Sequence, residues 1–253
     1  MKIVKFKKVK NNQYEILLKD GNILKLYDDV ILKYNLIIEK NIPDNIIYEI
    51  VKYNSSLDAY YIVLKYLNNK MHTKLEIQKY LEKKEFSDVI IKDTIDKLEK
   101  NKLINEIDYL KAFVNDQIKF THNGPHKIAN KLYTLGIEKE SVYSYLANVD
   151  DNIWNDKIKK LIDKKIKSNK NYSEIVLKNK IVQFIINEGY DRDMITSILK
   201  NYNNLSNPDI LIKEYNKQKK KLSKKFDGEA LEFQIKMKLK AKGFNLEDMK
   251  KCL

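Results

Sequence analysis

The chain of 253 residues has little of several residue types that mark other classes of protein. Its one cysteine, Cys252, leaves it without an internal disulfide, which suits a reducing compartment. Six glycines and three prolines are few breaks for this length, and this favours helices over sheet. No apolar run approaches the ~18 residues that span a bilayer, and the N-terminus lacks the apolar stretch of a signal peptide. We therefore expect a cytoplasmic protein that does not contact a membrane.

The usual signs of an enzyme are also absent. Neither G-x-x-x-x-G-K-[ST] nor G-x-G-x-x-G occurs, and acidic residues alternate with lysines at helical spacings, so no carboxylate pair stands out. His122 and His126 have a spacing that can bind zinc on a helix, but Pro125 lies between them and no third ligand is near. The sequence predicts no catalytic, cofactor or metal site.

Strand signals are confined to the N-terminal segment. Residues 2–9 alternate apolar and basic, Tyr14 to Leu18 alternate again, and 23–26 form a third run. Asp20-Gly21 predicts a hairpin with a type I′ turn, whose central residues both need φ > 0. We expect a three-stranded meander, then a short helix over residues 28–34 and another from Pro43-Asp44 toward Tyr53.

Four segments of the remaining chain align without gaps. They are anchored on bulky apolar residues spaced 51, 53 and 54 residues apart: Phe86, Ile137, Tyr190 and Phe244. Apolar residues recur nine and five positions before each anchor, at Ile77, Leu81, Ile128, Leu132, Ile181, Ile185, Ile235 and Leu239, and five and nine positions after it, at Ile91, Ile95, Val142, Leu146, Ile195, Leu199, Met249 and Leu253. Three anchors follow a glycine, Gly136, Gly189 or Gly243, and the first follows Glu85.

These offsets predict a helix, a tight corner and a second helix in each copy. A glycine in the left-handed conformation would end the first helix, and the anchor would contact the residue five positions earlier, as in a Schellman motif. The same anchor would contact the residue five positions later and so begin the next helix as a hydrophobic staple. Ser87, Asp191 and Asn245 suit the N-cap that follows, and Glu138 suits it less well.

A further amphipathic stretch precedes each pair, over residues 59–67, 107–116, 153–166 and 210–222. The sequence therefore predicts a mainly α fold of tandem three-helix repeats that form an elongated, curved body behind the small β-meander. The predicted divisions are 1–55, 56–104, 105–149, 150–205 and 206–253. An ordinary helical domain without a shared surface is the alternative, and it explains the regular spacing less well.

The formal net charge of +14 predicts a polyanionic partner. Two lysine clusters lie on the predicted first helices of the third and fourth repeats. The first comprises Lys157, Lys159, Lys160, Lys164, Lys165 and Lys167, and the second comprises Lys217, Lys219, Lys220, Lys221, Lys224 and Lys225. Equivalent helices of adjacent repeats would join them into one stripe that contacts phosphate or an acidic protein. Charge runs also occur as plain solvated faces, which is the alternative for each single lysine.

The second repeat carries a recognisable pattern. It runs through Leu103-Ile104-Asn105-Glu106 and Tyr109-Leu110-Lys111-Ala112-Phe113-Val114, then Gly124-Pro125-His126-Lys127-Ile128 and Gly136-Ile137. This pattern resembles the central repeat of the RecX family, and residues 73–77 with Leu81 are similar to the family's leading repeat. The resemblance covers essentially the whole chain and is strongest over 57–146. The N-terminal meander and the C-terminal repeats are similar to those of the longer family members found in Gram-positive bacteria. Glu106, Leu110 and Gln117 depart from the family pattern.

The resemblance implies a regulator that binds the RecA recombinase on single-stranded DNA. Such a protein lies in the groove of the RecA filament and restrains filament growth, ATPase and strand exchange. It thereby modulates recombinational repair and the SOS response, without catalysis or a cofactor, and we expect a monomer. Direct nucleic-acid binding and a general protein-interaction scaffold remain alternatives.

Overall fold

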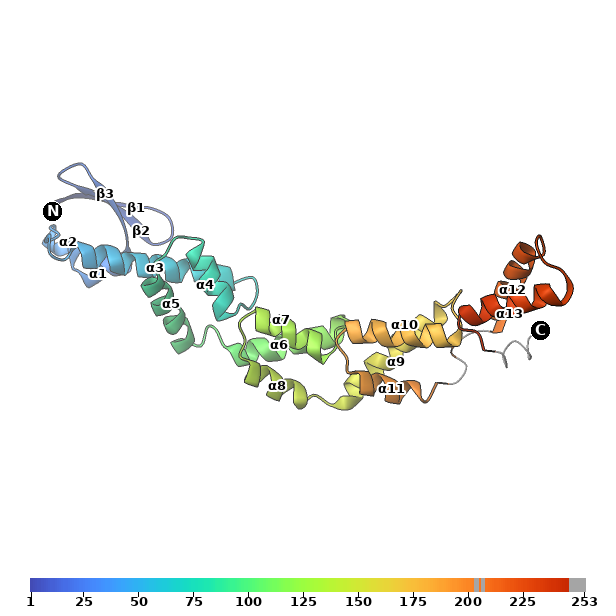
Figure 1. Ribbon diagram of the computed structural model, residues 1–253. Helices are drawn as coiled ribbons and strands as arrows, with labels where there is room; N and C mark the ends of the chain where they lie inside the picture. Colours follow the sequence, from blue (N-terminus) through green and yellow to red (C-terminus); the bar gives the residue numbers. More distant parts are fainter. Residues whose placement is uncertain (203–204, 206–207, 246–253) are drawn as a thin grey trace. The chain divides into compact units, whose positions relative to one another are not determined.

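The computed structural model describes residues 1–202, 205 and 208–245 and is mainly helical, with one three-stranded sheet near the N-terminus (Figure 1). The strands are β1 (Ile3–Lys8), β2 (Gln13–Leu18) and β3 (Ile23–Tyr27). The helices are α1 (Asp28–Lys33), α2 (Leu36–Glu39), α3 (Ile47–Leu67), α4 (Lys74–Glu82), α5 (Asp88–Lys100), α6 (Glu106–Phe120), α7 (Pro125–Thr134), α8 (Lys139–Ala147), α9 (Asp151–Lys167), α10 (Glu174–Asn187), α11 (Arg192–Leu199), α12 (Pro208–Leu222) and α13 (Gly228–Ala241).

The chain divides into two compact units. The first comprises Met1–Leu110 with Leu135–Ile137, and the second comprises Lys111–Thr134 with Glu138–Leu253. The predicted division into four repeats stays a prediction, although the helices follow one another in the predicted order. Among the described helices, none has the length and apolarity needed to span a bilayer.

The predicted meander is confirmed, with antiparallel strands in the order β1-β2-β3. Ile16, Leu18 and Leu26 are buried on one face because side chains alternate along a strand. They share a core with Val30 of α1 and Ile50 of α3. The sheet therefore packs on helices, as three strands need to do for stability.

The predicted type I′ turn at Asp20-Gly21 is wrong in detail. Only Gly21 has a positive φ there (89°), and the Leu18 N–H donates to the Asn22 carbonyl at 2.9 Å, as in a turn with a glycine bulge. The Asp20 carboxylate holds this shape by accepting the Asn22 backbone N–H at 3.0 Å. The turn with two positive φ values lies instead at Asn11 (60°) and Asn12 (56°).

The two helices predicted before and after residue 55 form one helix, α3. Asn54-Ser55-Ser56 is a turn-like sequence, but the Asn54 side chain bonds outside its own helix. Its Oδ1 accepts the Tyr27 N–H at 2.9 Å, and its Nδ2 donates to the Lys25 carbonyl at 3.1 Å. Because the oxygen and the nitrogen of this side-chain amide both bond to β3, they do not compete with the helix backbone.

The predicted corners are confirmed. Glu85, Gly136, Gly189 and Gly243 all have positive φ. The N–H groups of Phe86, Tyr190 and Phe244 donate to the carbonyls five residues earlier at 3.3, 3.3 and 3.1 Å, which is the longer bond of a Schellman motif. Ile137, Tyr190 and Phe244 are buried, and Phe86 is half-buried against its core. Met249, Leu253 and Cys252 lie outside the described residues.

The apolar positions around each anchor form the core of the helical part. All eight residues located nine and five positions before an anchor are fully buried. Of those that follow, Ile91, Val142, Ile195 and Leu199 are buried, and Ile95 and Leu146 are half-buried. The helices that follow the first three corners begin after Ser87, Glu138 and Asp191, although none of these three side chains makes a capping hydrogen bond.

Candidate interaction surface

The first lysine cluster lies on α9, and its members differ in exposure. Lys159, Lys160, Lys164 and Lys167 are exposed, whereas Lys157 and Lys165 are half-buried. Trp154, Ile158, Leu161 and Ile162 are buried on the opposite face of the helix, so the four exposed lysines face solvent. Four exposed ammonium groups along one helix can attract phosphates or carboxylates.

Lys157 is used inside the protein. Its Nζ donates to the backbone carbonyls of Gln117 at 3.2 Å and Ile118 at 2.9 Å, near the C-terminal end of α6. Burial, together with the neighbouring charge of Lys160, lowers the pKa of this ammonium from its ordinary value. A cation at a helix C-terminus satisfies carbonyls that the helix itself cannot. We therefore infer that Lys157 joins α9 to α6, and its predicted contact with a partner stays untested.

An open hollow of about 500 Å³ lies on the outer face of α9. It is lined by Lys160, Asp163, Lys164, Lys167 and Ser168. The Asp163 carboxylate accepts a hydrogen bond from the Tyr202 hydroxyl at 2.9 Å. Burial and this bond raise the pKa of Tyr202 to about 12. The hollow therefore presents three lysines around one carboxylate that is already hydrogen-bonded.

The second lysine cluster lies on the fourth sequence repeat. Lys217, Lys219, Lys220 and Lys221 are on α12, Lys224 and Lys225 follow it, and all six are exposed. Ile210 and Leu211, near the start of the same helix, are buried. The joining of the two clusters into one stripe stays a prediction.

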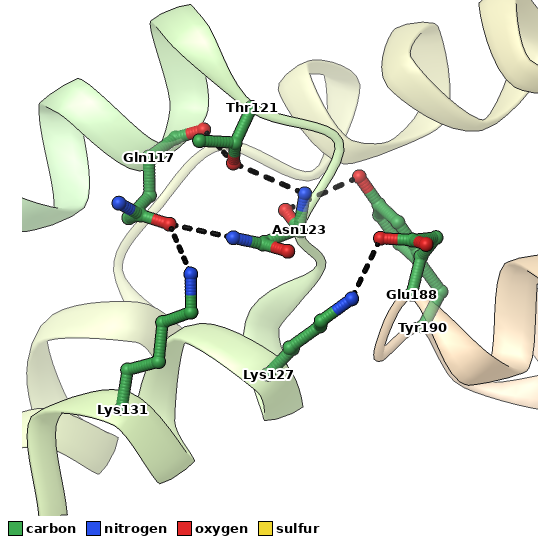
Figure 2. A network of polar contacts seen from close by, with 7 residues as sticks. All are labelled: Gln117, Thr121, Asn123, Lys127, Lys131, Glu188 and Tyr190. Carbon is green, nitrogen blue, oxygen red and sulfur yellow. Dashed lines mark hydrogen bonds and ion pairs between the residues drawn. The ribbon is translucent and has the colours of Figure 1, made fainter. Parts of the chain in front are cut away.

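A contact between the second and third repeats, shown from close by in Figure 2, was not among the predicted features. Backbone N–H groups of Gly124 and His126 donate to the Glu188 and Gly189 carbonyls at 2.7 and 3.1 Å. The end of α10 thus satisfies N–H groups at the start of α7. Lys127 and Glu188 form an ion pair at 2.9 Å beside this contact.

Side chains fill the space around that contact. The Tyr190 hydroxyl donates to the Asn123 carbonyl at 3.5 Å, and burial raises the pKa of Tyr190, with a further contribution from the charge of Glu188. Gln117, one of the departures from the family pattern, accepts hydrogen bonds at Oε1 from Asn123 at 2.6 Å and Lys131 at 3.2 Å (Figure 2). Its amide therefore holds the loop before α7.

The two histidines that were considered as zinc ligands have different surroundings. His126 Nε2 is 2.8 Å from Asp191 Oδ1, on the surface beside the same contact, and His122 is exposed. Within residues 1–202, 205 and 208–245, no group of three or more His, Cys, Asp or Glu side chains is placed to hold a metal ion.

The corner glycines pack closely on the preceding repeat. A Cβ at Gly136, Gly189 or Gly243 would meet side-chain or backbone atoms at 2.8, 2.6 or 2.7 Å. In each case the contacted residue lies at the start of the second helix of the preceding repeat: Leu75 for Gly136, Lys127 for Gly189 and Ser173 for Gly243. The first corner has no preceding repeat, and there Glu85 takes the glycine's place.

Comparisons with known proteins agree with these features. A family model described as the first three-helix domain of RecX matches residues 59–98. A "Regulatory protein RecX" of Staphylococcus haemolyticus is 27% identical over 263 residues, which cover 100% of this chain and 96% of that protein. A crystal structure of a regulatory protein RecX has a TM-score of 0.69 at 23% identity and covers 79% of this chain and 100% of its own, so it supports the fold.

The "Regulatory protein RecX" of Finegoldia magna carries the assignment further. It is 33% identical over 168 residues, which cover 66% of this chain and 82% of that relative. On this similarity, together with the repeated corners and the N-terminal meander, the chain belongs to the RecX family.

Proposed function

We propose that this protein regulates the RecA recombinase by binding its filament on single-stranded DNA. It would restrain filament growth, ATPase and strand exchange, and so modulate recombinational repair and the SOS response. Membership of the RecX family carries the proposal, since similarity to a relative named as a regulatory protein extends over the whole chain. We further propose that the protein acts in the cytoplasm as a monomer, by binding and without catalysis or a cofactor.

The exposed lysines of α9 and α12 support this function. A RecA filament contains DNA phosphates, so a basic surface would accelerate the encounter between the two. We propose that the exposed members of both clusters contact the filament. These are Lys159, Lys160, Lys164, Lys167, Lys217, Lys219, Lys220, Lys221, Lys224 and Lys225.

The DNA-dependent ATPase of RecA tests the function. Adding this protein to RecA on single-stranded DNA should suppress ATP hydrolysis and strand exchange at or below stoichiometric amounts. Unchanged RecA activity at saturating protein would contradict the proposal. A pull-down of RecA with and without single-stranded DNA and nucleotide would identify which form of RecA is bound.

Direct nucleic-acid binding is the second candidate. The second lysine cluster favours it, because all six of its members are exposed. Under this alternative, bare single-stranded DNA binds tightly, and its affinity falls steeply as salt rises. Replacing Lys217, Lys220 and Lys224 with glutamate would then weaken binding to bare DNA most. Weak binding to bare DNA beside tight binding to the RecA filament would support the first function instead.

A further inference from the structure

A groove of about 460 Å³ lies on the third repeat, between the end of α9 and the outer face of α10. This volume is within the ~300–1,000 Å³ usual for small-molecule sites. Leu177 and Ile181 form its buried apolar floor. Its rim is polar and includes Lys165, Tyr172 and Lys180. An apolar floor under a charged rim suits a ligand with one flat apolar part and one anionic part.

Two rings of the groove each carry an ammonium group on one face. Lys165 Nζ lies 3.8 Å from the centre of the Phe184 ring, and Lys180 Nζ lies 4.6 Å from the centre of the Tyr172 ring. Aromatic faces stack with nucleobases, and lysines beside them can pair with the phosphates that link those bases. Each of these two pairs therefore provides both contacts that a nucleotide needs.

The charge of the groove is of one sign. The residues that line it in the described part of the chain include no acidic side chain. Ser168 also lines the neighbouring hollow that contains Lys160, Lys164 and Lys167. Lysines thus continue beyond the groove and outnumber the single carboxylate there, Asp163, as a path for successive phosphates would require.

Amide groups at one end of the groove favour nucleic acid over an acidic protein segment. Gln183 Nε2 donates to Asn187 Oδ1 at 3.0 Å, which directs Gln183 Oε1 and Asn187 Nδ2 to other partners. Amide acceptors and donors of this kind can hydrogen-bond to the edge of a base. An acidic peptide would use the lysines but would not need these amides or the ring faces.

We propose that this groove binds an unpaired nucleotide of single-stranded nucleic acid, with Tyr172 and Phe184 as stacking partners and Lys165 and Lys180 as phosphate contacts. The proposal rests on the proposed function, because it names the part of the filament that the third repeat contacts. The residues of the groove outside α9 were not among the predicted contacts.

Fluorescence anisotropy with a labelled oligothymidylate, in the absence of RecA, tests the groove. Tyr172 is 43% exposed, so Tyr172→Ala should fold normally, as circular dichroism and an unchanged melting temperature would verify. We expect Tyr172→Ala and Lys180→Gln each to weaken binding, the first by roughly tenfold. Phe120→Ala is the matched control, because Phe120 is 71% exposed and also lies beneath a lysine, Lys119, but outside the groove.

Cross-linking with an oligonucleotide that carries 5-iodouracil locates the contact. Adducts at Tyr172 or Phe184 support the proposal, whereas adducts confined to other residues overturn it. Equal affinity of Tyr172→Ala and wild type also overturns it. A third result would overturn it as well: polyglutamate of equal charge displaces the oligonucleotide from wild type and binds Tyr172→Ala less well. The groove would then bind an acidic protein.

The RecA assay separates failure of the groove from failure of the proposed function. If wild type suppresses the RecA ATPase while oligothymidylate binding does not depend on Tyr172, the groove proposal is wrong and the function stands. If oligothymidylate binding depends on Tyr172 but RecA activity never changes, the regulatory function is wrong and the groove stands.

Discussion

Lysine side chains of the same helix have different roles in this protein. Lys157 and Lys160 are three residues apart on α9, yet one donates to carbonyls of α6 and the other is exposed at the rim of a hollow. The difference follows from the neighbour that each side chain meets. Burial near α6 gives Lys157 a fixed position, and solvent leaves Lys160 available for an anionic partner.

Lys157→Met should destabilise the second unit, because two backbone carbonyls of α6 would lose a charged donor. We expect a loss of about 1.5–3 kcal/mol in the free energy of unfolding, the usual range for hydrogen bonds to a charged group. Urea unfolding followed by circular dichroism measures it. Lys160→Met is the matched control and should leave stability unchanged; equal stability of the two variants would contradict the structural role of Lys157.

His72 is a second residue whose surroundings determine its behaviour. It stacks on Tyr66 with ring centres 3.7 Å apart, and Tyr66 stacks on Tyr80 at 4.2 Å. Its Nδ1 lies 3.4 Å from Glu76 Oε2 but makes no hydrogen bond of good geometry. Burial lowers the pKa of His72 from 6.5, despite the opposing charge of Glu76. The folded protein therefore favours the neutral ring.

Acidification should destabilise the first unit through His72. Because the pKa is lower in the folded state, the unfolded chain binds more protons, so stability is lost as pH falls below about 6.5. The loss should approach about 1.4 kcal/mol per pH unit between the two pKa values. Proton NMR of the His72 ring gives the folded pKa, and urea unfolding of His72→Phe should lack this pH dependence. A folded pKa above 6.5 would refute the prediction.

At the scale of elements, the corners at Gly136, Gly189 and Gly243 lie against the start of a helix in the repeat before them. Positive φ alone would tolerate a residue other than glycine, as Glu85 shows at 63°. The later corners add a second requirement, because a Cβ at Gly189 would lie 2.6 Å from the backbone nitrogen of Lys127. Contact between repeats, more than the turn itself, therefore requires glycine at these positions.

Gly189→Ala and Gly21→Ala separate the two requirements. Both glycines have φ near 90°, but a Cβ at Gly21 would meet nothing within 4 Å. We expect Gly21→Ala to cost about 1–2 kcal/mol for backbone strain. Gly189→Ala should cost several kcal/mol more or prevent folding, since the backbones of residue 189 and Lys127 must move apart. Melting temperatures compare the variants, and similar losses for both would show that close approach does not matter.

At the scale of the whole molecule, tandem repeats predict an elongated body, which would suit binding along a filament. A compact protein of this length would have a radius of gyration of about 18 Å. Small-angle X-ray scattering of the monomer should give a clearly larger value. A radius near 18 Å would contradict the elongated, curved body predicted from the repeat spacing.

The features that the sequence alone determined are local ones. Alternation and the D-G pair specify the meander, and an apolar anchor, which follows a glycine in three of the four copies, specifies each corner, because each depends on residues a few positions apart. The family pattern and its general function followed from the same short segments.

Only the tertiary structure decided which side chains meet across the chain. It made α3 continuous by pairing Asn54 with β3, and it buried Lys157 against α6. It also brought Lys165 of α9 over Phe184 of α10. Such contacts join residues that are tens of positions apart, and periodicity within a helix carries no information about which neighbour its outer face will meet.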